Sequence, residues 1–120
     1  LNGIALQGVG NGTVVENVQI HAGLDDGLEF FGGTVNVKNV VLTANSDDAF
    51  DWVEGWSGKA QFVVIQHDPD DSDAGIEADN TNTAFDAEPR ARPTLYNFTI
   101  VGEPTPGSNA GPVPANSSNR

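Results

Sequence analysis

The stretch Lys38-Asn39-Val40-Val41-Leu42 decides the fold, because three related stretches occur elsewhere in the chain. They are Glu16-Asn17-Val18-Gln19-Ile20, Gln61-Phe62-Val63-Val64-Ile65 and Tyr96-Asn97-Phe98-Thr99-Ile100. The first three copies end at Ile20, Leu42 and Ile65, so they follow one another at nearly constant intervals. Repeats of this length are typical of solenoid proteins, in which each repeat packs only against its neighbours.

A second repeated unit alternates with the first. Its copies are Asp25-Asp26-Gly27-Leu28-Glu29-Phe30, Asp47-Asp48-Ala49-Phe50-Asp51-Trp52 and Asp73-Ala74-Gly75-Ile76-Glu77-Ala78. Leu28, Phe50 and Ile76 occupy the same place in the three copies, and Ile4 fits this place one repeat before Leu28. Both units alternate apolar and polar residues, and no window has the apolar spacing of a long helix. Each repeat therefore predicts two short strands.

The repeats predict an all-β fold, a right-handed parallel β-helix (solenoid) of about four coils with about 22–26 residues per coil. Like positions of successive coils stack about 4.8 Å apart in such a fold. We expect one inward column of Ile4, Leu28, Phe50 and Ile76, and two more of Val18 with Ile20, Val40 with Leu42, and Val63 with Ile65. An antiparallel sandwich of short strands is the alternative, and the constant register favours the solenoid.

Two stretches interrupt the repeat. Residues 80–92 are polar and contain Pro89, so we expect an inserted loop in a coil that resumes at Pro93. Residues 103–120 contain four of the seven prolines together with Gly, Ser and Asn. The predicted organisation is therefore β-helix coils over residues 1–102 and a tail or long loop over residues 103–120.

Composition excludes several classes of partner. The 120 residues carry 17 Asp and Glu against 5 Lys and Arg, a formal net charge of −12. Five basic residues are too few to neutralise a run of phosphates, which excludes nucleic acid. No stretch approaches the ~20 apolar residues that span a bilayer, which excludes insertion into a membrane. The chain has no Met and starts at Leu1, so we expect a piece of a longer solenoid whose open ends contact another chain or the rest of the parent protein.

Stacking of the repeats places acidic residues in columns. The columns are Asp25, Asp47 and Asp73; Asp26 and Asp48; and Glu29, Asp51 and Glu77. Carboxylates ~5 Å apart repel by about 1 kcal/mol or more per pair, so we expect protons or a cation between them. Calcium suits such a site, because it takes six to eight oxygen ligands in flexible geometry. The alternative is that these acids are solvated turn residues.

One motif resembles a known family. Asn45-Ser46-Asp47-Asp48-Ala49-Phe50-Asp51 is similar to the Asn-Ser-Asp-Asp-Gly-aromatic-Asp motif of the family 9 pectate lyases, which are right-handed β-helix enzymes. Asp26-Gly27-Leu28 resembles the Asp-Gly-Phe motif of their preceding coil. The resemblance implies a calcium ion held by Asp26, Asp47, Asp48 and Asp51. The stacked columns add Asp25, Glu29, Asp73 and Glu77 as secondary candidates. The resemblance also implies an alternative function as a calcium-dependent polysaccharide lyase acting by β-elimination.

The chain departs from these lyases at the general base. The family places a lysine in a Gly-aromatic-Lys setting, where this chain has Gly75-Ile76-Glu77. The remaining basic candidates for catalysis are Lys59, Arg90 and Arg92. We expect Lys59 to be a solvated turn residue and the arginines to pair with two nearby acids, Asp86 and Glu88. The chain also resembles β-helical repeats of surface and secreted proteins in Gram-negative bacteria, which favours a non-catalytic role.

Three further groups of residues are candidates for binding. The loop acids Asp68, Asp70, Asp71 and Asp73 follow His67 and predict either a second cation site or a solvated loop. His21 and His67 lack a third ligand, so we expect polar turn residues and not a zinc site. Three aromatic residues of adjacent coils are candidates for contact with sugar rings, although residues of this kind more often pack in the core or at coil corners; they are Phe31, Trp52 and Trp56.

The sequence therefore predicts a calcium-binding β-helix module of an exported bacterial protein, with a structural or polysaccharide-binding role. A lyase is the first alternative, and a structural fragment that stacks end to end on itself is the second. The expected location is secreted, periplasmic or at the cell surface.

Overall fold

The computed structural model describes residues 1–102, and every regular element in this range is a β-strand. The short strands are β1 (Ile4–Gln7), β3 (Leu28–Phe31), β5 (Phe50–Val53) and β7 (Ile76–Ala78). The long strands are β2 (Val14–His21), β4 (Asn36–Thr43), β6 (Lys59–Gln66) and β8 (Thr94–Val101). Within residues 1–102 no helix is long and apolar enough to cross a membrane. The tail predicted for residues 103–120 lies outside the described residues.

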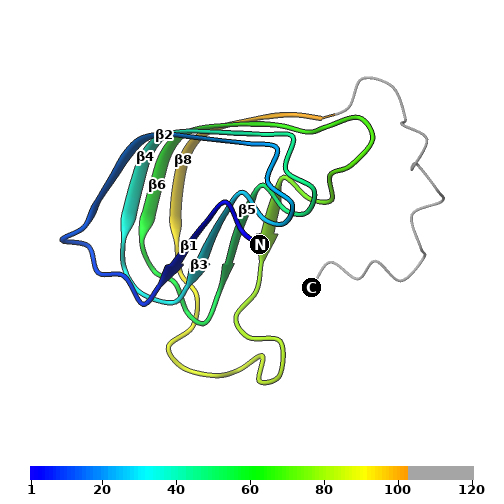
Figure 1. Ribbon diagram of the computed structural model, residues 1–120. Coiled ribbons are helices and arrows are strands. Elements are labelled where there is room, and N and C mark those ends of the chain that lie inside the picture. Colours follow the sequence, from blue (N-terminus) through cyan, green and yellow to red (C-terminus); the bar gives the residue numbers. More distant parts are fainter. Residues whose placement is uncertain (103–120) are drawn as a thin grey trace.

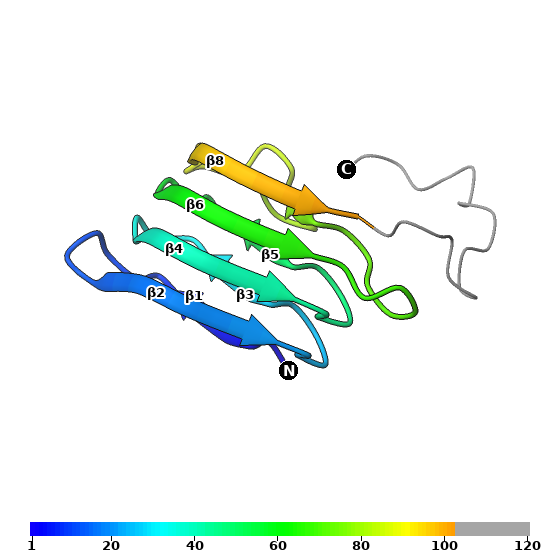
Figure 2. The ribbon, with the colours of Figure 1, turned by 90° about the horizontal axis from the view of Figure 1, so that it is seen from above.

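The strands form two parallel sheets, and the chain crosses from one sheet to the other after every strand (Figure 1). The short sheet has the order β1-β3-β5-β7, and the long sheet has the order β2-β4-β6-β8. Figure 2 shows the long strands side by side, each displaced by one step along the stack. This arrangement is a parallel β-helix, as the repeats predicted, and its strands complete about three turns where about four coils were expected.

The strand register confirms the predicted columns. Ile4 pairs with Leu28, Leu28 with Phe50, and Phe50 with Ile76 in the short sheet. In the long sheet the predicted partners also align, as Val18, Val40 and Val63 in one column and Ile20, Leu42 and Ile65 in another. The apolar repeat sets this register, because a slip by one residue would turn every inward side chain outward.

The core lies between the two sheets and is densest in the middle coils. Leu28, Phe50 and Leu42 are fully buried, whereas Ile4, the equivalent of Leu28 in the first coil, is only partly buried, and Ile100, the equivalent of Leu42 in the last coil, is 48% exposed. Aromatic rings fill the centre: the Phe30 and Trp56 rings stack with centroids 3.9 Å apart. Burial of these side chains stabilises the fold through removal of apolar surface from water.

A kink of the backbone, called the bulge here, crosses all four long strands at the same level, and the strands pair in equal register on both sides of it. Its residues are Asn17, Asn39, Phe62 and Asn97, which have positive φ angles of 59°, 56°, 58° and 55°. Each of these residues is exposed and follows another outward-facing residue, so the alternation of faces shifts by one at this point. The apolar pattern of the repeats does not predict this bulge.

The connection between β7 and β8, residues 79–93, has no strand of its own, and the loop predicted at residues 80–92 lies in it. Asn80 organises this connection, because its Nδ2 donates to the carbonyl oxygens of Phe85 and Ala87 at 3.0 and 2.9 Å. Its Oδ1 accepts from the Ala91 amide at 2.8 Å. Hydrogen bonds within the connection therefore hold its shape. After it, β8 pairs with β6 in the same register as the earlier long strands.

Candidate metal centre

The acidic columns lie where the long sheet passes into the short sheet. Asp26 and Asp48 stand two residues before the inward Leu28 and Phe50, and each reaches the next turn of the chain. Asp26 Oδ1 accepts from the Asp48 amide at 3.2 Å, and Asp48 Oδ1 accepts from the Ala74 amide at 2.7 Å. One oxygen of each carboxyl group is therefore used to fasten successive turns together.

Close backbone contact keeps these turns in place. The Gly27 amide donates to the Asp48 carbonyl at 2.8 Å, and the Ala49 amide donates to the Ala74 carbonyl at 3.0 Å. A Cβ atom added at Gly27 would lie 2.5 Å from the Ala49 carbonyl oxygen. Only glycine fits at this position without moving the backbone of the next turn.

Three buried carboxylates meet at the start of β3 and β5 and are called the inner cluster here: Asp26, Glu29 and Asp51. Carboxylate oxygens of all three lie within 4.8 Å of one another, and the residues are 9%, 8% and 4% exposed. Glu29 and Asp51 are register partners in adjacent strands, and Asn2 Nδ2 donates to Glu29 Oε2. Asp51 Oδ1 is buried and has no hydrogen-bond partner among the described residues. An unpaired buried acceptor of this kind is costly unless a proton or cation reaches it.

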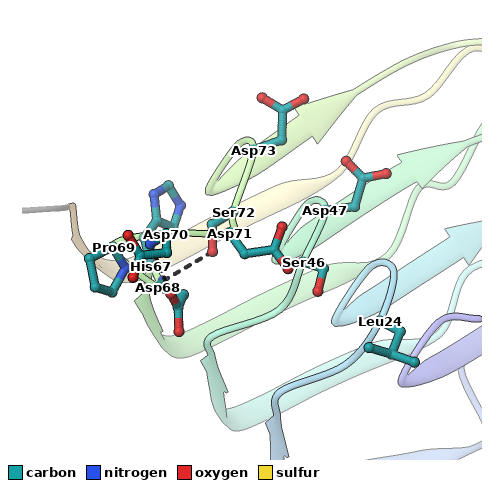
Figure 3. A pocket seen from close by; sticks show the side chains of 10 residues that line it. All are labelled: Leu24, Ser46, Asp47, His67, Asp68, Pro69, Asp70, Asp71, Ser72 and Asp73. Carbon is teal, nitrogen blue, oxygen red and sulfur yellow. Dashed lines mark hydrogen bonds between the residues drawn. The ribbon is translucent and has the colours of Figure 1, made fainter. Parts of the chain in front are cut away.

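A second group, called the outer cluster, is formed by Asp47, Asp48 and Asp73, whose carboxylate oxygens also lie within 4.8 Å of one another. Asp47 and Asp73 are exposed and come from successive turns (Figure 3). Asp25 brings Asp26 and Asp47 into a third such group, and Asp25 Oδ2 pairs with the amino group of Leu1 at 3.1 Å.

Burial changes the protonation of the central carboxyl groups. Burial, the hydrogen bond with Glu29 and the charge of Asp26 raise the pKa of Asp51 to about 8. Burial and the Glu29 charge raise the pKa of Asp26 to about 7. Burial and a hydrogen bond with Glu77 raise the pKa of Asp48 to about 7, and burial with the Asp48 charge raises the pKa of Asp47. Near neutral pH Asp51 is therefore mostly protonated, and Asp26 and Asp48 are partly protonated, unless a cation takes the place of the protons.

The predicted ligands are close in space and are spread over all three groups, and Asp26 and Asp47 meet in the third group. Asp26 and Asp51 belong to the inner cluster, and Asp47 and Asp48 belong to the outer cluster. Of the secondary candidates, Glu29 joins the inner cluster, Asp73 joins the outer cluster and Asp25 joins the third group. Glu77 is the register partner of Asp51 and bonds with Asp48.

The basic candidates lie away from these clusters. Lys59 is the first residue of β6 in the long sheet and is exposed. Arg90 pairs with Asp86 and Glu88, as expected, with its Nε 3.6 Å from Glu88 Oε1. Arg92 is exposed, and its backbone amide donates to the Trp56 carbonyl at 3.0 Å.

Core packing is the role that the structure shows for two of the three aromatic candidates. Trp56 is 0% exposed and its Nε1 donates to the Val35 carbonyl at 3.1 Å, so its ring has no free face for a sugar. The ring of Trp52 is buried too, with its centroid 5.9 Å from that of Trp56. Phe31, at the end of β3, is partly buried.

The loop after β6 borders an open hollow of about 480 Å³ with an acidic lining (Figure 3). Acids of the loop contribute to that lining, together with His67 and Asp47; they are Asp68, Asp70, Asp71 and Asp73. Ser72 holds the loop, because its Oγ accepts from the Asp68 amide at 3.0 Å and donates to the Asn45 carbonyl at 2.8 Å. His21, at the end of β2, lines a neighbouring hollow of about 260 Å³ that Asp68 and Asp71 also border, and its Nδ1 is 2.8 Å from Thr43 Oγ1.

Comparison with known proteins agrees with the fold. A search of curated proteins and a search of solved structures found no match. A family model described as a pectate-lyase-like beta helix domain matches residues 1–112. The chain therefore belongs to the pectate-lyase-like beta helix domain family.

Proposed function

We propose that this chain is a calcium-binding β-helix module in which the bound cation joins successive turns. The observation that carries this proposal is Asp51 Oδ1, a buried carboxylate oxygen without a hydrogen-bond partner among the described residues. It lies in the inner cluster, where Asp26 and Glu29 bring further carboxylate oxygens within 4.8 Å. A divalent cation there would both pair this oxygen and remove the repulsion between the carboxylates.

The donor set supports calcium as the cation. All three residues of the inner cluster supply oxygen, and neither histidine belongs to the acidic groups described above. Hard oxygen donors suit calcium and magnesium, whereas zinc sites use His and Cys. Calcium accepts irregular sets of six to eight oxygens, including backbone carbonyls and water, while magnesium requires near-ideal octahedral geometry.

The role that we propose for the ion is structural. The inner cluster takes Asp26 and Glu29 from one turn and Asp51 from the next, so an ion bound there would hold the two turns together. Domains of this family are often extracellular, where modules bind calcium with dissociation constants of about 10⁻⁴–10⁻³ M. We propose that the chain belongs to a secreted, periplasmic or cell-surface protein that uses such calcium.

Thermal unfolding with and without calcium tests the proposal. Calcium at about 100 times its dissociation constant adds about 2.7 kcal/mol of stability to a protein that binds it only when folded. For a domain of this size we expect the melting temperature to rise by about 10 °C over that in EDTA. Asp51→Asn removes one ligand charge and keeps the size of the side chain, so its melting temperature should no longer respond to calcium.

Glu16→Gln is the matched control, because it removes one exposed negative charge from β2, in the other sheet. This variant should respond to calcium as the parent does. Equal melting temperatures of the parent protein in calcium and in EDTA would overturn the proposal, and so would an undiminished calcium response in Asp51→Asn.

A further inference from the structure

The chain contains two Asn-Gly pairs, Asn2-Gly3 and Asn11-Gly12, and the structure places them in opposite surroundings. An asparagine before glycine can lose its side-chain amide, because the backbone nitrogen of the glycine can attack the side-chain carbonyl carbon and no Cβ atom hinders the approach. The attack requires that this nitrogen lose its proton and that the asparagine rotate toward it. Hydrogen bonds of the glycine amide and of the asparagine side chain therefore decide whether such a pair reacts.

The first pair is held by the next turn of the chain. The Gly3 amide donates to the Asp26 carbonyl at 2.7 Å, and Asn2 Nδ2 donates to Glu29 Oε2. A Cβ atom added at Gly3 would lie 2.7 Å from the Gly27 carbonyl oxygen, so the two turns pack closely here. Attack by the Gly3 nitrogen on the Asn2 side chain would have to break both hydrogen bonds.

The second pair is open. It lies in the connection between β1 and β2, which protrudes from the coils at the left of Figure 1. Asn11 and Gly12 are exposed, and the Gly12 amide donates no hydrogen bond to any residue in the range 1–102. Apart from the adjoining residues of the chain, no heavy atom lies within 4 Å of the place that a Cβ atom would take at Gly12. Neither the nitrogen nor the side chain of this pair is therefore restrained.

We propose that Asn11 is a site of spontaneous deamidation, with water and hydroxide as the reactants. Hydroxide removes the proton of the Gly12 amide, and the nitrogen forms a bond with Asn11 Cγ. The bond between Cγ and Nδ2 breaks, and the side-chain amide leaves as ammonia after it takes a proton from water. Water then opens the resulting succinimide ring. Opening at Cγ gives aspartate, whereas opening at the backbone carbonyl carbon gives isoaspartate, in which the chain continues through the side chain.

Both products change the surface of this connection. Each makes the chain, whose formal charge is −12, more negative by one unit. Isoaspartate also adds a methylene group to the backbone of a turn in which the Thr13 amide donates to the Gly10 carbonyl at 3.1 Å. The fold should be retained, because the pairing of β2 with β4 begins at Val14, after this turn. The site has no residue in common with the acidic clusters and does not depend on the calcium proposal.

Incubation of the folded chain in mildly alkaline buffer, followed by tandem mass spectrometry, tests the proposal. Cleavage after Glu16 releases residues 1–16, so that one peptide contains both pairs and their conversion is compared directly. Asn11 should convert at least about tenfold faster than Asn2, the difference expected for about 1.4 kcal/mol of protection by the hydrogen bonds at Asn2. An isoaspartate-specific methyltransferase that uses S-adenosylmethionine should label the product at Asn11. In urea, which removes the protection, the two pairs should convert at similar rates.

Gly12→Ala is the matched variant, because its Cβ atom hinders attack by the nitrogen while the open space around Gly12 accepts a methyl group. This variant should convert Asn11 much more slowly than the parent does and should keep the melting temperature of the parent. Equal rates at Asn2 and Asn11 in the folded chain would overturn the proposal. So would an unchanged rate in folded Gly12→Ala, or a folded chain that keeps Asn11 intact while the chain in urea converts it. All of these outcomes are independent of the calcium experiment.

Discussion

In both sheets, side chains of the same kind stack on one another from strand to strand. The effect on their hydrogen bonding is opposite in the two sheets. In the long sheet the side-chain amide of Asn39 donates to that of Asn17 in the strand below, at 3.0 Å. In the short sheet Glu29 and Asp51 stack in the same way, and Asp51 Oδ1 has no hydrogen-bond partner among the described residues. An amide both donates and accepts, so a stack of amides satisfies itself. A stack of carboxylates only accepts, and it needs something from outside the chain.

This difference distinguishes the sheet that a bound cation can stabilise from the sheet whose side chains satisfy one another. The core between them belongs to both, since the Phe50 ring in β5 meets the Phe98 ring in β8 with centroids 5.3 Å apart. The turns around Asp26 and Asp51 are where a cation can add stability, whereas the outward amides need no ion. Three experiments test this division, beginning with the side chain on which both sheets depend.

Phe50→Ala should have the largest effect. Phe50 is fully buried and its ring also lies 5.1 Å from that of Phe30, between centroids. Loss of a buried phenyl group costs about 3–5 kcal/mol of unfolding free energy, through lost burial and the cavity left behind. Denaturation in urea at saturating calcium measures this loss. Phe85→Ala, which truncates an exposed ring, should change stability by less than about 0.5 kcal/mol. A loss of unfolding free energy below about 1 kcal/mol in Phe50→Ala would contradict a core shared by the two sheets around this ring.

A change of pH should have the next largest effect on the melting temperature. This effect arises from the buried carboxyl groups of the short sheet and the turn before it. The pKa of Asp51 is raised from 3.8 to about 8, and that of Asp26 to about 7. The folded state therefore binds protons that the unfolded chain has released, so without calcium the melting temperature should fall as pH rises from about 4 to about 8. Calcium should lessen this fall, because the ion replaces the protons.

Circular dichroism melts at about pH 4 to about pH 9, in chelator and in calcium, measure this dependence. Asp51→Asn is the informative variant, because an amide does not titrate and part of the fall with pH should disappear. A parent protein whose melting temperature in chelator rises across this range would show that the buried carboxyl groups are not protonated in the folded state.

Asn39→Ala should have the smallest effect, and it concerns the long sheet alone. The substitution removes the hydrogen bond to Asn17 and places alanine at a φ of 56°, at a combined cost of about 1–2 kcal/mol. Asn39→Gly separates the two contributions, because glycine adopts this conformation without strain. Both variants should keep the full calcium response of the parent. A reduced response would mean that the two sheets are coupled beyond the shared core.

The repeat spacing predicted the fold well, for a physical reason. In a solenoid the same inward position recurs once per coil, so the apolar residues Leu28 and Phe50 mark the register directly. The bulge left a weaker mark, since the residues at its positions point outward and need not be apolar. Asn17 and Asn39 share the residue type that tolerates positive φ, and this repetition is the signal that could have located it.

The site was predictable only in part. Spacing alone placed Asp26, Asp48 and Asp51 near one another, because stacked columns require it. It did not predict how the carboxylates divide between clusters, since that depends on which oxygen accepts from the next backbone amide. The repeat spacing also did not predict that Trp56 is fully buried. This residue follows β5 in a turn, and only the fold shows its ring lying flat on Phe30.

The long connection between β7 and β8 has a consequence for how such a chain can change in length. Ile20 pairs with Leu42 and Leu42 with Ile65 at nearly equal intervals along the chain, but Ile65 pairs with Ile100, which follows after a much longer interval. The additional residues leave the pairing of β6 with β8 intact, since they lie outside both sheets. The exposed residues 82–86 of this connection are therefore a position at which insertion or exchange of sequence is compatible with the fold, and a natural place for grafting a new recognition loop.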